Sequence, residues 1–263
     1  MRILFVGDVY GEPGQRIVRE RLRGLRERLR CDWVIVNGEN AAAGLGITPR
    51  NARDLFQWGA DALTSGNHIW RKSAISRYLE EEPRLLRPAN FPAENPGRGL
   101  VVLGEGAAAI AVINVMGRVF MDPLDCPFQV AETLLAGLDP AIRVRLIDFH
   151  AEATSEKQAF ARHFDGRVSA VVGTHTHVAT ADERVLPLGT GTITDVGMTG
   201  PIESVIGMDC ERAVARFVNR RTAPIVPAGG RAMLNGVLLD VDDESGRCLS
   251  IERIREDEDV SAS

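Results

Sequence analysis

Short runs of apolar residues recur along the 263-residue chain, and most of them end in glycine or in polar residues. An apolar run of about four to eight residues bounded by turn residues is typical of a strand buried on both faces. The pattern predicts such strands at residues 2–7, 33–36, 60–65, 144–147 and 168–172. Further strands are predicted around Val101 and Ile113. Residues 232–241 and 247–254 are predicted to form a hairpin around an acidic turn.

Apolar residues spaced three or four apart predict helices between these strands. In residues 13–29 they give an arginine-rich helix one apolar face, formed by Ile17, Val18, Leu22, Leu25 and Leu29. Thr48 followed by Pro49 is typical of a helix N-terminus. Ser155-Glu156-Lys157-Gln158 fits a capping box, which predicts a helix from there to about Phe164. A further helix is predicted at about 209–219.

The order of these elements predicts an α/β fold. Strands and helices alternate in the first part of the chain and further strands follow, which favours sheets covered by helices on the outside. No internal repeat or low-complexity linker divides the sequence. We therefore expect a single domain over residues 1–255, followed by a polar C-terminal tail, 256–263, that frays.

Composition limits the classes of function. The net charge of −5 argues against a broad nucleic-acid surface, although a small phosphorylated substrate remains possible in a locally positive pocket. The four cysteines lie far apart, which disfavours disulfides and thiolate zinc sites. The opening MRILFVGD resembles a strand more than a signal peptide, and no apolar run is long enough to span a membrane. These features predict a cytoplasmic protein.

Polar residues that can bind metal ions follow several of the predicted strands. They are Asp8, Glu39, Asn40, Asn67, His68, His150, His175 and His177. In open α/β sheets, ligands collect outside the carboxyl ends of the strands, so we expect these side chains at one rim. Imidazole with carboxylate and amide oxygen, without thiolate, favours manganese or iron over structural zinc. Glu39 has two oxygens and can bridge two ions.

Each of these residues alone has a simpler explanation. Asp8 can be a helix cap, Glu39-Asn40 ordinary turn chemistry, His150 a buried core histidine, and the His175-x-His177 pair an accident. Their joint occurrence in order, each after its own strand, favours one site. His163 follows helix residues, and we interpret it as a helix C-terminal residue without a role in the site.

Longer motifs carry a resemblance to a known family. The ordered set of an Asp, an acidic residue, G-N-H, a His and G-x-H-x-H is similar to the calcineurin-like metallophosphoesterases. Among these, the chain resembles the YmdB-like bacterial branch. The resemblance covers essentially the whole chain. It rests on GDVYGEPG (7–14), NGENAAAGLGIT (37–48), SGNHIW (65–70), RPANFP (87–92), DFHAEATSEKQA (148–159), GTHTHVATADERVLPLGTGTITDVGMTGP (173–201) and IGMD (206–209).

The resemblance implies a four-layer α/β/β/α sandwich with two mixed sheets. It also implies a site of two metal ions, iron or manganese. Tyr10 stands where the wider superfamily has a histidine ligand, and the branch replaces that ligand by Asn40. By this match Asp8, Glu39, Asn40 and His177 hold one ion. Glu39, Asn67, His150 and His175 hold the other.

The implied activity is hydrolysis of small phosphodiesters, notably 2′,3′-cyclic nucleotides. We expect in-line attack by a metal-bridging hydroxide, with His68 as the catalytic residue that protonates the leaving oxygen or stabilises the transition state. Asp148 either orients His150 or another group near the metals, or is structural. A phosphomonoesterase or nuclease on the same site is the alternative, and a regulatory metal-binding protein is a weaker one. A homo-oligomer is possible.

Overall fold

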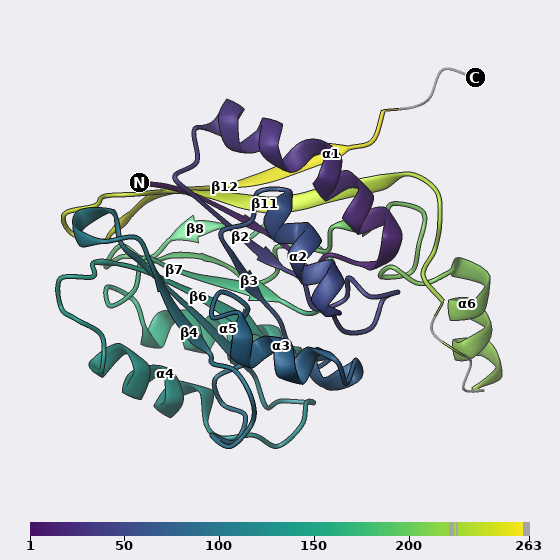
Figure 1. Cartoon of the computed structure of the whole chain (residues 1–263), viewed down its shortest axis with the longest axis horizontal. Helices are drawn as coiled ribbons and strands as arrows, with labels where there is room; N and C mark the ends of the chain where they lie inside the picture. The colour runs from purple at the N-terminus through teal and green to yellow at the C-terminus, as the bar shows by residue number, and fades with distance from the viewer. Residues whose placement is uncertain (221–223, 225, 260–263) are drawn as a thin grey trace.

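The computed structural model describes residues 1–220, 224 and 226–259 and arranges them in four layers, with two sheets face to face and helices outside each (Figure 1). In the first sheet, β1 (Arg2–Val6), β2 (Trp33–Asn37) and β3 (Ala62–Thr64) are parallel. β11 (Ala232–Val241) pairs antiparallel with β1, with β12 (Cys248–Asp257) and, at its start, with β10 (Gly200–Pro201).

The second sheet has the order β4-β5-β6-β7-β9-β8. Its centre is parallel and consists of β5 (Ile110–Met116), β6 (Val144–His150), β7 (Ala170–Thr174) and β9 (Gly191–Ile193). β4 (Leu100–Leu103) and β8 (Arg184–Val185) are antiparallel edges. Both sheets are therefore mixed, as expected for this α/β class.

The outer layers are helical. α1 (Gly11–Leu29), α2 (Pro49–Gln57) and α3 (Ile75–Glu81) pack on the first sheet, and α4 (Pro127–Ala136) and α5 (Thr154–His163) on the second. Short 3-10 turns occupy Ile69–Arg71 and Gly106–Ala108. α6 (Cys210–Asn219) stands off from the layers in Figure 1.

Alternation along the strands explains the layers. In β1, Leu4 and Val6 join the core under the helices, whereas Ile3 and Phe5 join the core between the two sheets. Successive side chains of a strand point to opposite faces, so a continuous apolar run fills two cores at once. A third core lies between the second sheet and α4 and α5. The apolar runs therefore hold the two sheets face to face, so that the ends of their strands lie near one another.

Most predicted elements are confirmed, but the predicted start of α5 is wrong. Thr48 caps α2 together with Asn51, and Asp209 caps α6. The capping box at Ser155 is not formed. α5 begins at Thr154 after Ala153, which makes no side-chain cap bond, and the Glu156 carboxylate accepts instead from the amide of Arg118. α3, α4 and β8 to β10 were not predicted, because their apolar runs are short or weakly periodic.

The expected fraying of the C-terminus is wrong for its first residues. β12 continues through Glu256 and Asp257, and the Glu258 carboxylate accepts from the amide of Ala232. Residues 260–263 lie outside the described residues. The limit of the expected domain at residue 255 therefore falls inside a strand, and the assignment of a single domain stays a prediction.

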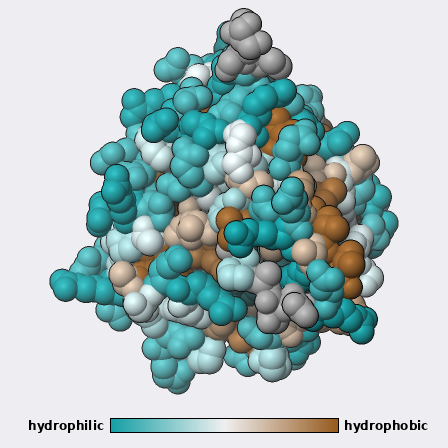
Figure 2. All heavy atoms as spheres, turned by 90° about the vertical axis from the view of Figure 1, so that its right-hand side faces the viewer, coloured by the Kyte–Doolittle hydropathy of each residue, from teal (hydrophilic) through white to brown (hydrophobic). Residues whose placement is uncertain are grey.

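The face that carries α6 is mainly polar, and apolar atoms form patches within it (Figure 2). Val214, Phe217 and Val218 of α6 are among the exposed large apolar residues. No helix in the described ranges combines the length and apolar character needed to cross a membrane.

Candidate metal centre

The site lies where the layer between the sheets turns from apolar to polar. The inward side chains of β6 are Val144 and Leu146 at its start and Asp148 and His150 at its end. Pairing of β6 with β7 sets His150 opposite Thr174. The polar ends of β2, β6 and β7 therefore face one another across the sandwich, with the loops that follow β1, β2, β3 and β7.

One set of donor atoms surrounds the His150 imidazole. Its Nε2 lies 2.7 Å from Glu39 Oε2, 3.0 Å from Asn67 Oδ1 and 3.0 Å from His175 Nδ1. Ligand atoms about 2.1 Å from one metal ion lie about 3 Å apart when their bonds meet at right angles. The three distances from His150 Nε2 match this spacing.

A second set lies beside the first. His177 Nε2 is 3.2 Å from Asn40 Nδ2 and 4.0 Å from Asp8 Oδ1. Asn40 Oδ1 is 2.8 Å from His68 Nδ1. For its oxygen to act beside His177, the Asn40 amide has to turn so that Oδ1 replaces Nδ2. This set is looser than the first.

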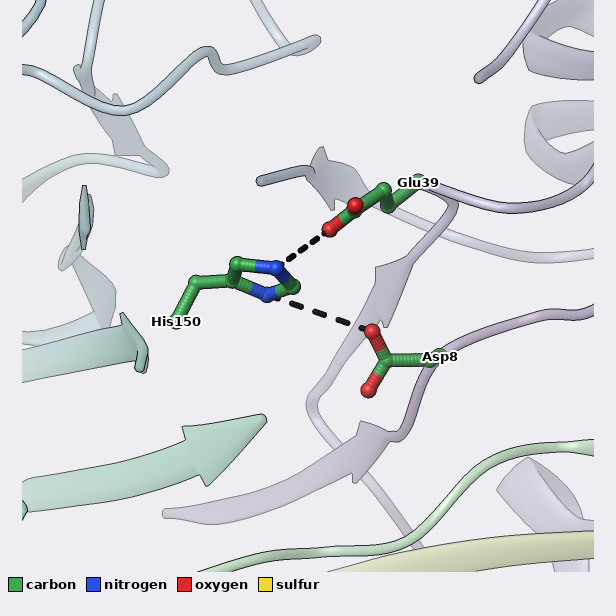
Figure 3. A group of neighbouring side chains, drawn as sticks. All are labelled: Asp8, Glu39 and His150. Atoms are coloured by element: carbon green, nitrogen blue, oxygen red, sulfur yellow. Dashed lines mark ion pairs between the residues drawn. The ribbon is translucent and has the colours of Figure 1, made fainter. Parts of the chain in front are cut away.

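Glu39 lies between the two sets. Its Oε2 faces His150, while its Oε1 accepts from the His68 amide at 3.1 Å and lies 3.0 Å from His68 Nδ1. Asp8, Glu39 and His150 point toward one another in Figure 3, and one ligand atom from each lies within 4.8 Å of the others. A carboxylate placed in this way can serve both sets.

Two buried carboxylate oxygens of the site accept no hydrogen bond from the protein. Asp8 Oδ1 and Glu39 Oε2 have no hydrogen-bond donor, although both residues are fully buried. Burying two carboxylates is costly without compensating positive charge, and a metal ion would add to the charge that His150 supplies beside both oxygens. Backbone packing is adapted to this arrangement, because a Cβ on Gly66 would come within 2.0 Å of Glu39 Oε2. The residues present fit bound metal ions.

The ionisable side chains of the site shift one another's pKa values. Burial raises the pKa of Asp8. Burial acts in the same direction on Glu39, but His150 and His68 outweigh it and hold the pKa of the Glu39 carboxyl well below its usual range. Burial and the neighbouring His150 lower the pKa of His175 to about 3. This lowered pKa favours the neutral form of His175, the form of imidazole that binds metals. On His150, burial lowers the pKa, but Glu39 outweighs it and raises the pKa to about 9.

A buried chain of hydrogen bonds fixes the His150 ring. Asn37 Nδ2 and Thr174 Oγ1 donate to the Asp148 carboxylate, at 2.9 and 2.7 Å. The Thr174 oxygen lies 2.9 Å from His150 Nδ1. Since its only proton goes to Asp148, Thr174 accepts from His150 Nδ1, so in the neutral form of this imidazole the lone pair lies on Nε2, the atom that faces Glu39 and Asn67. Asp148 thus orients His150 through Thr174, and burial raises the pKa of Asp148 to about 7.

The turn that carries His175 and His177 is held by hydrogen bonds to the buried side chain of Asp195. His175 and His177 have φ angles of 98° and 66°, which non-glycine residues rarely adopt. Between them, the amide and hydroxyl of Thr176 donate to Asp195 Oδ2 at 2.9 and 2.6 Å. The same oxygen accepts from Lys157 Nζ at 2.9 Å, and this ion pair is buried. A buried ion pair therefore supports the strained turn.

The outer nitrogens of these histidines are also engaged. His175 Nε2 lies 3.1 Å from Glu152 Oε2, and His177 Nδ1 donates to the Ile206 carbonyl at 2.8 Å. The Tyr10 ring packs edge-on against His177, with 5.5 Å between the ring centres. These contacts leave His175 Nδ1 and His177 Nε2 directed to the site.

All eight residues singled out from the sequence lie at this rim, and His163 lies apart and pairs with Glu132. Sequence reasoning missed a group of supporting residues: Asn37, Glu152, Lys157, Thr174 and Asp195. Two signals pointed to some of them. Asn37 and Thr174 end predicted strands, and Lys157 and Asp195 lie in the long motifs. Only the strand register, however, shows that Thr174 faces His150.

The chain is similar to known proteins over almost its full length. A family model described as YmdB-like protein matches residues 4–254. A Bacillus subtilis (strain 168) protein named 2′,3′-cyclic-nucleotide 2′-phosphodiesterase is 48% identical over 254 residues, 97% of this chain and 96% of the relative.

Two solved structures share the fold with a TM-score of 0.93 each. One is a Thermus thermophilus protein described as hypothetical, 44% identical, with 98% of this chain and 100% of that chain covered. The other is a Mycoplasma pneumoniae protein described as a novel phosphatase, 36% identical, with 99% and 95% covered. By the match of the family model over residues 4–254 and the 48% identity to the Bacillus subtilis relative, this chain belongs to the YmdB-like protein family.

Proposed function

We propose that this protein is a metal-dependent phosphodiesterase that hydrolyses 2′,3′-cyclic nucleotides. The observation that carries the proposal is the position of Glu39, whose Oε2 lies 2.7 Å from His150 Nε2 and which, with Asp8 and His150, offers ligand atoms that all lie within 4.8 Å of one another. The Bacillus subtilis relative, 48% identical, is named for this activity. Asp8 Oδ1 and Glu39 Oε2 are buried and accept no hydrogen bond, which supports the binding of metal ions beside them.

In this proposal, each metal ion is held by one of the two donor sets described above. Glu39, Asn67, His150 and His175 hold one ion, and Asp8, Glu39, Asn40 and His177 hold the other. Oxygen and imidazole donors without thiolate favour iron or manganese. When bound, such ions neutralise charge on the phosphoryl oxygens and make a nucleophile available near neutral pH.

His68 is the proposed catalytic residue. Its Nδ1 edge contacts Asn40 Oδ1 and Glu39 Oε1, so its Nε2 edge is the one left to face substrate. The side chain is 23% exposed at the rim, in contrast to the fully buried Glu39. In this role His68 gives a proton from Nε2 to the departing 2′-oxygen of the ribose.

The proposal is tested with His68→Ala and Glu39→Gln, with His163→Ala as a histidine control away from the site. We expect His68→Ala to keep two ions per chain while kcat falls about 10²- to 10⁴-fold. Glu39→Gln should lose metal as well as turnover. Metal analysis and kinetics on the same preparations measure both. Loss of metal from His68→Ala would overturn the division of roles.

The description of the Mycoplasma pneumoniae structure as a phosphatase supports a second candidate, a phosphomonoesterase on the same site. A panel of 2′,3′-cyclic nucleotide, p-nitrophenyl phosphate and RNA separates the candidates, and preferential turnover of the monoester or of RNA would replace our proposal. The cytoplasmic location, the absence of a broad nucleic-acid surface and a homo-oligomer remain predictions from the sequence.

A further inference from the structure

The loop of residues 117–125, between β5 and α4, holds an aromatic ring in an unusual way. Phe120 has a φ of 61° and is 89% exposed. A bulky residue in the left-handed region is strained, and this ring gains almost no packing in return. Among the phenylalanines, tyrosines and tryptophans in the described part of the chain, only Phe120 and Phe217 are exposed. Folding alone does not account for this phenylalanine.

The loop begins beside the metal centre and is firmly held there. Met116 pairs with His150, and the Gly117 amide donates to the His150 carbonyl at 2.9 Å. The Glu156 carboxylate then accepts from the amides of Arg118 and Val119. Three residues of chain span at most about 11 Å, so Phe120 stays within that distance of Gly117.

A second anchor closes the loop. Asn90 Nδ2 donates to the carbonyls of Met116 and Asp125, at 2.7 and 3.1 Å, and its Oδ1 accepts from the Met116 amide. Asn90 is buried in the RPANFP motif and Glu156 lies in the DFHAEATSEKQA motif. Neither residue belongs to the proposed ligand sets. Two of the motifs that carry the family resemblance thus fix the loop that carries the exposed ring, at the strand end where Gly117 bonds to His150.

We propose that Phe120 is a binding platform for the nucleobase of the substrate, which stacks on the ring while its cyclic phosphate lies at the metal centre. This inference rests on the proposed function and names the part of the substrate that the metals cannot recognise. Aromatic rings bind every base by stacking, with little preference among them. The protein therefore recognises cyclic nucleotides through the base with low base specificity.

The test uses Phe120→Gly, because glycine adopts the left-handed conformation without strain. The substrates are adenosine 2′,3′-cyclic phosphate and ribose 2′,3′-cyclic phosphate, which lacks the base. We expect KM for the nucleotide to rise about 5- to 100-fold with little change in kcat, and KM for the base-free compound to stay unchanged. Phe120→Trp should retain nucleotide binding. Phe217→Gly, at the other exposed ring, should leave both substrates unaffected.

The melting temperature of Phe120→Gly shows whether the ring serves binding or folding. Phe120→Gly should melt at the wild-type temperature or above it, whereas a ring kept for packing would make this variant melt lower. Equal KM values of wild type and Phe120→Gly for the nucleotide, or equal losses on both substrates, would overturn the inference. If the wild type cleaves neither substrate, the proposed function fails. Calorimetric binding of adenosine 3′-monophosphate against ribose 3-phosphate to both proteins then decides the role of Phe120.

Discussion

At the scale of single residues, Asn40 occupies the least regular position of the site. Its amide lies between His68 and His177, and Tyr10 packs against the same His177 ring. Tyr10 is only 3% exposed, and the replacement of a histidine ligand by the neutral amide of Asn40 stays a prediction. The identity of this residue was predictable from the motif, but the turn of its amide was not, because local contacts decide it.

Asn40→Ala tests this assignment. Removing one donor from the looser set should lower the metal content from two ions per chain to one, because the His150 set keeps all of its own side chains. Asn67→Ala is the matched variant and should affect the ion of the other set. Elemental analysis after dialysis measures both. Two ions retained at wild-type affinity in Asn40→Ala would show that this side chain is not a ligand.

At the scale of elements, α5 and the segment after β9 support the turn of His175 and His177. Lys157 from α5 reaches Asp195, which binds Thr176 between the two histidines. The helix was predicted from the sequence, but its first residue was misplaced because Ser155 and Glu156 fit a capping pattern. Glu156 binds the 117–125 loop instead. Local patterns do not reveal when a distant segment competes for a side chain.

Lys157→Met should lower the free energy of unfolding by roughly 3–5 kcal/mol, because Asp195 stays buried without its cation. The double variant Lys157→Met, Asp195→Asn removes both charges and should recover part of that loss. Chemical denaturation of the metal-loaded proteins measures the difference. If the double variant is no more stable than the single one, the two charges do not act as a pair.

At the scale of the whole molecule, the site joins the two sheets. Asp8, Glu39 and Asn67 follow strands of the first sheet, whereas His150 and His175 belong to the end of β6 and the loop after β7 in the second. The layers and most strands were predictable, since apolar alternation and motif order specify them. The register of β6 on β7 and the pairing of β1 with β11 depend on residues far apart, which a local pattern does not encode.

Metal removal should therefore weaken the docking of the sheets. A protein in solution with free metal at about a hundred times its dissociation constant gains about 2.7 kcal/mol, and chelation removes this gain. Thermal unfolding with and without EDTA should show a lower melting temperature without metal. Glu39→Gln, which is expected to bind no metal, serves as the control and should show no EDTA effect. An unchanged wild-type melting temperature would contradict a metal link between the sheets.

The pairing of β1 with β11 also bears on how the protein is made. Leu4 lies opposite Leu238, so one edge of β1 stays open until the ribosome has released residues 232–241. By then all eight predicted site residues have been synthesised. An open, apolar strand edge is a template for wrong pairing. Maturation of the centre thus waits for late translation, and the nascent chain is most exposed to aggregation in the interval before β11 arrives.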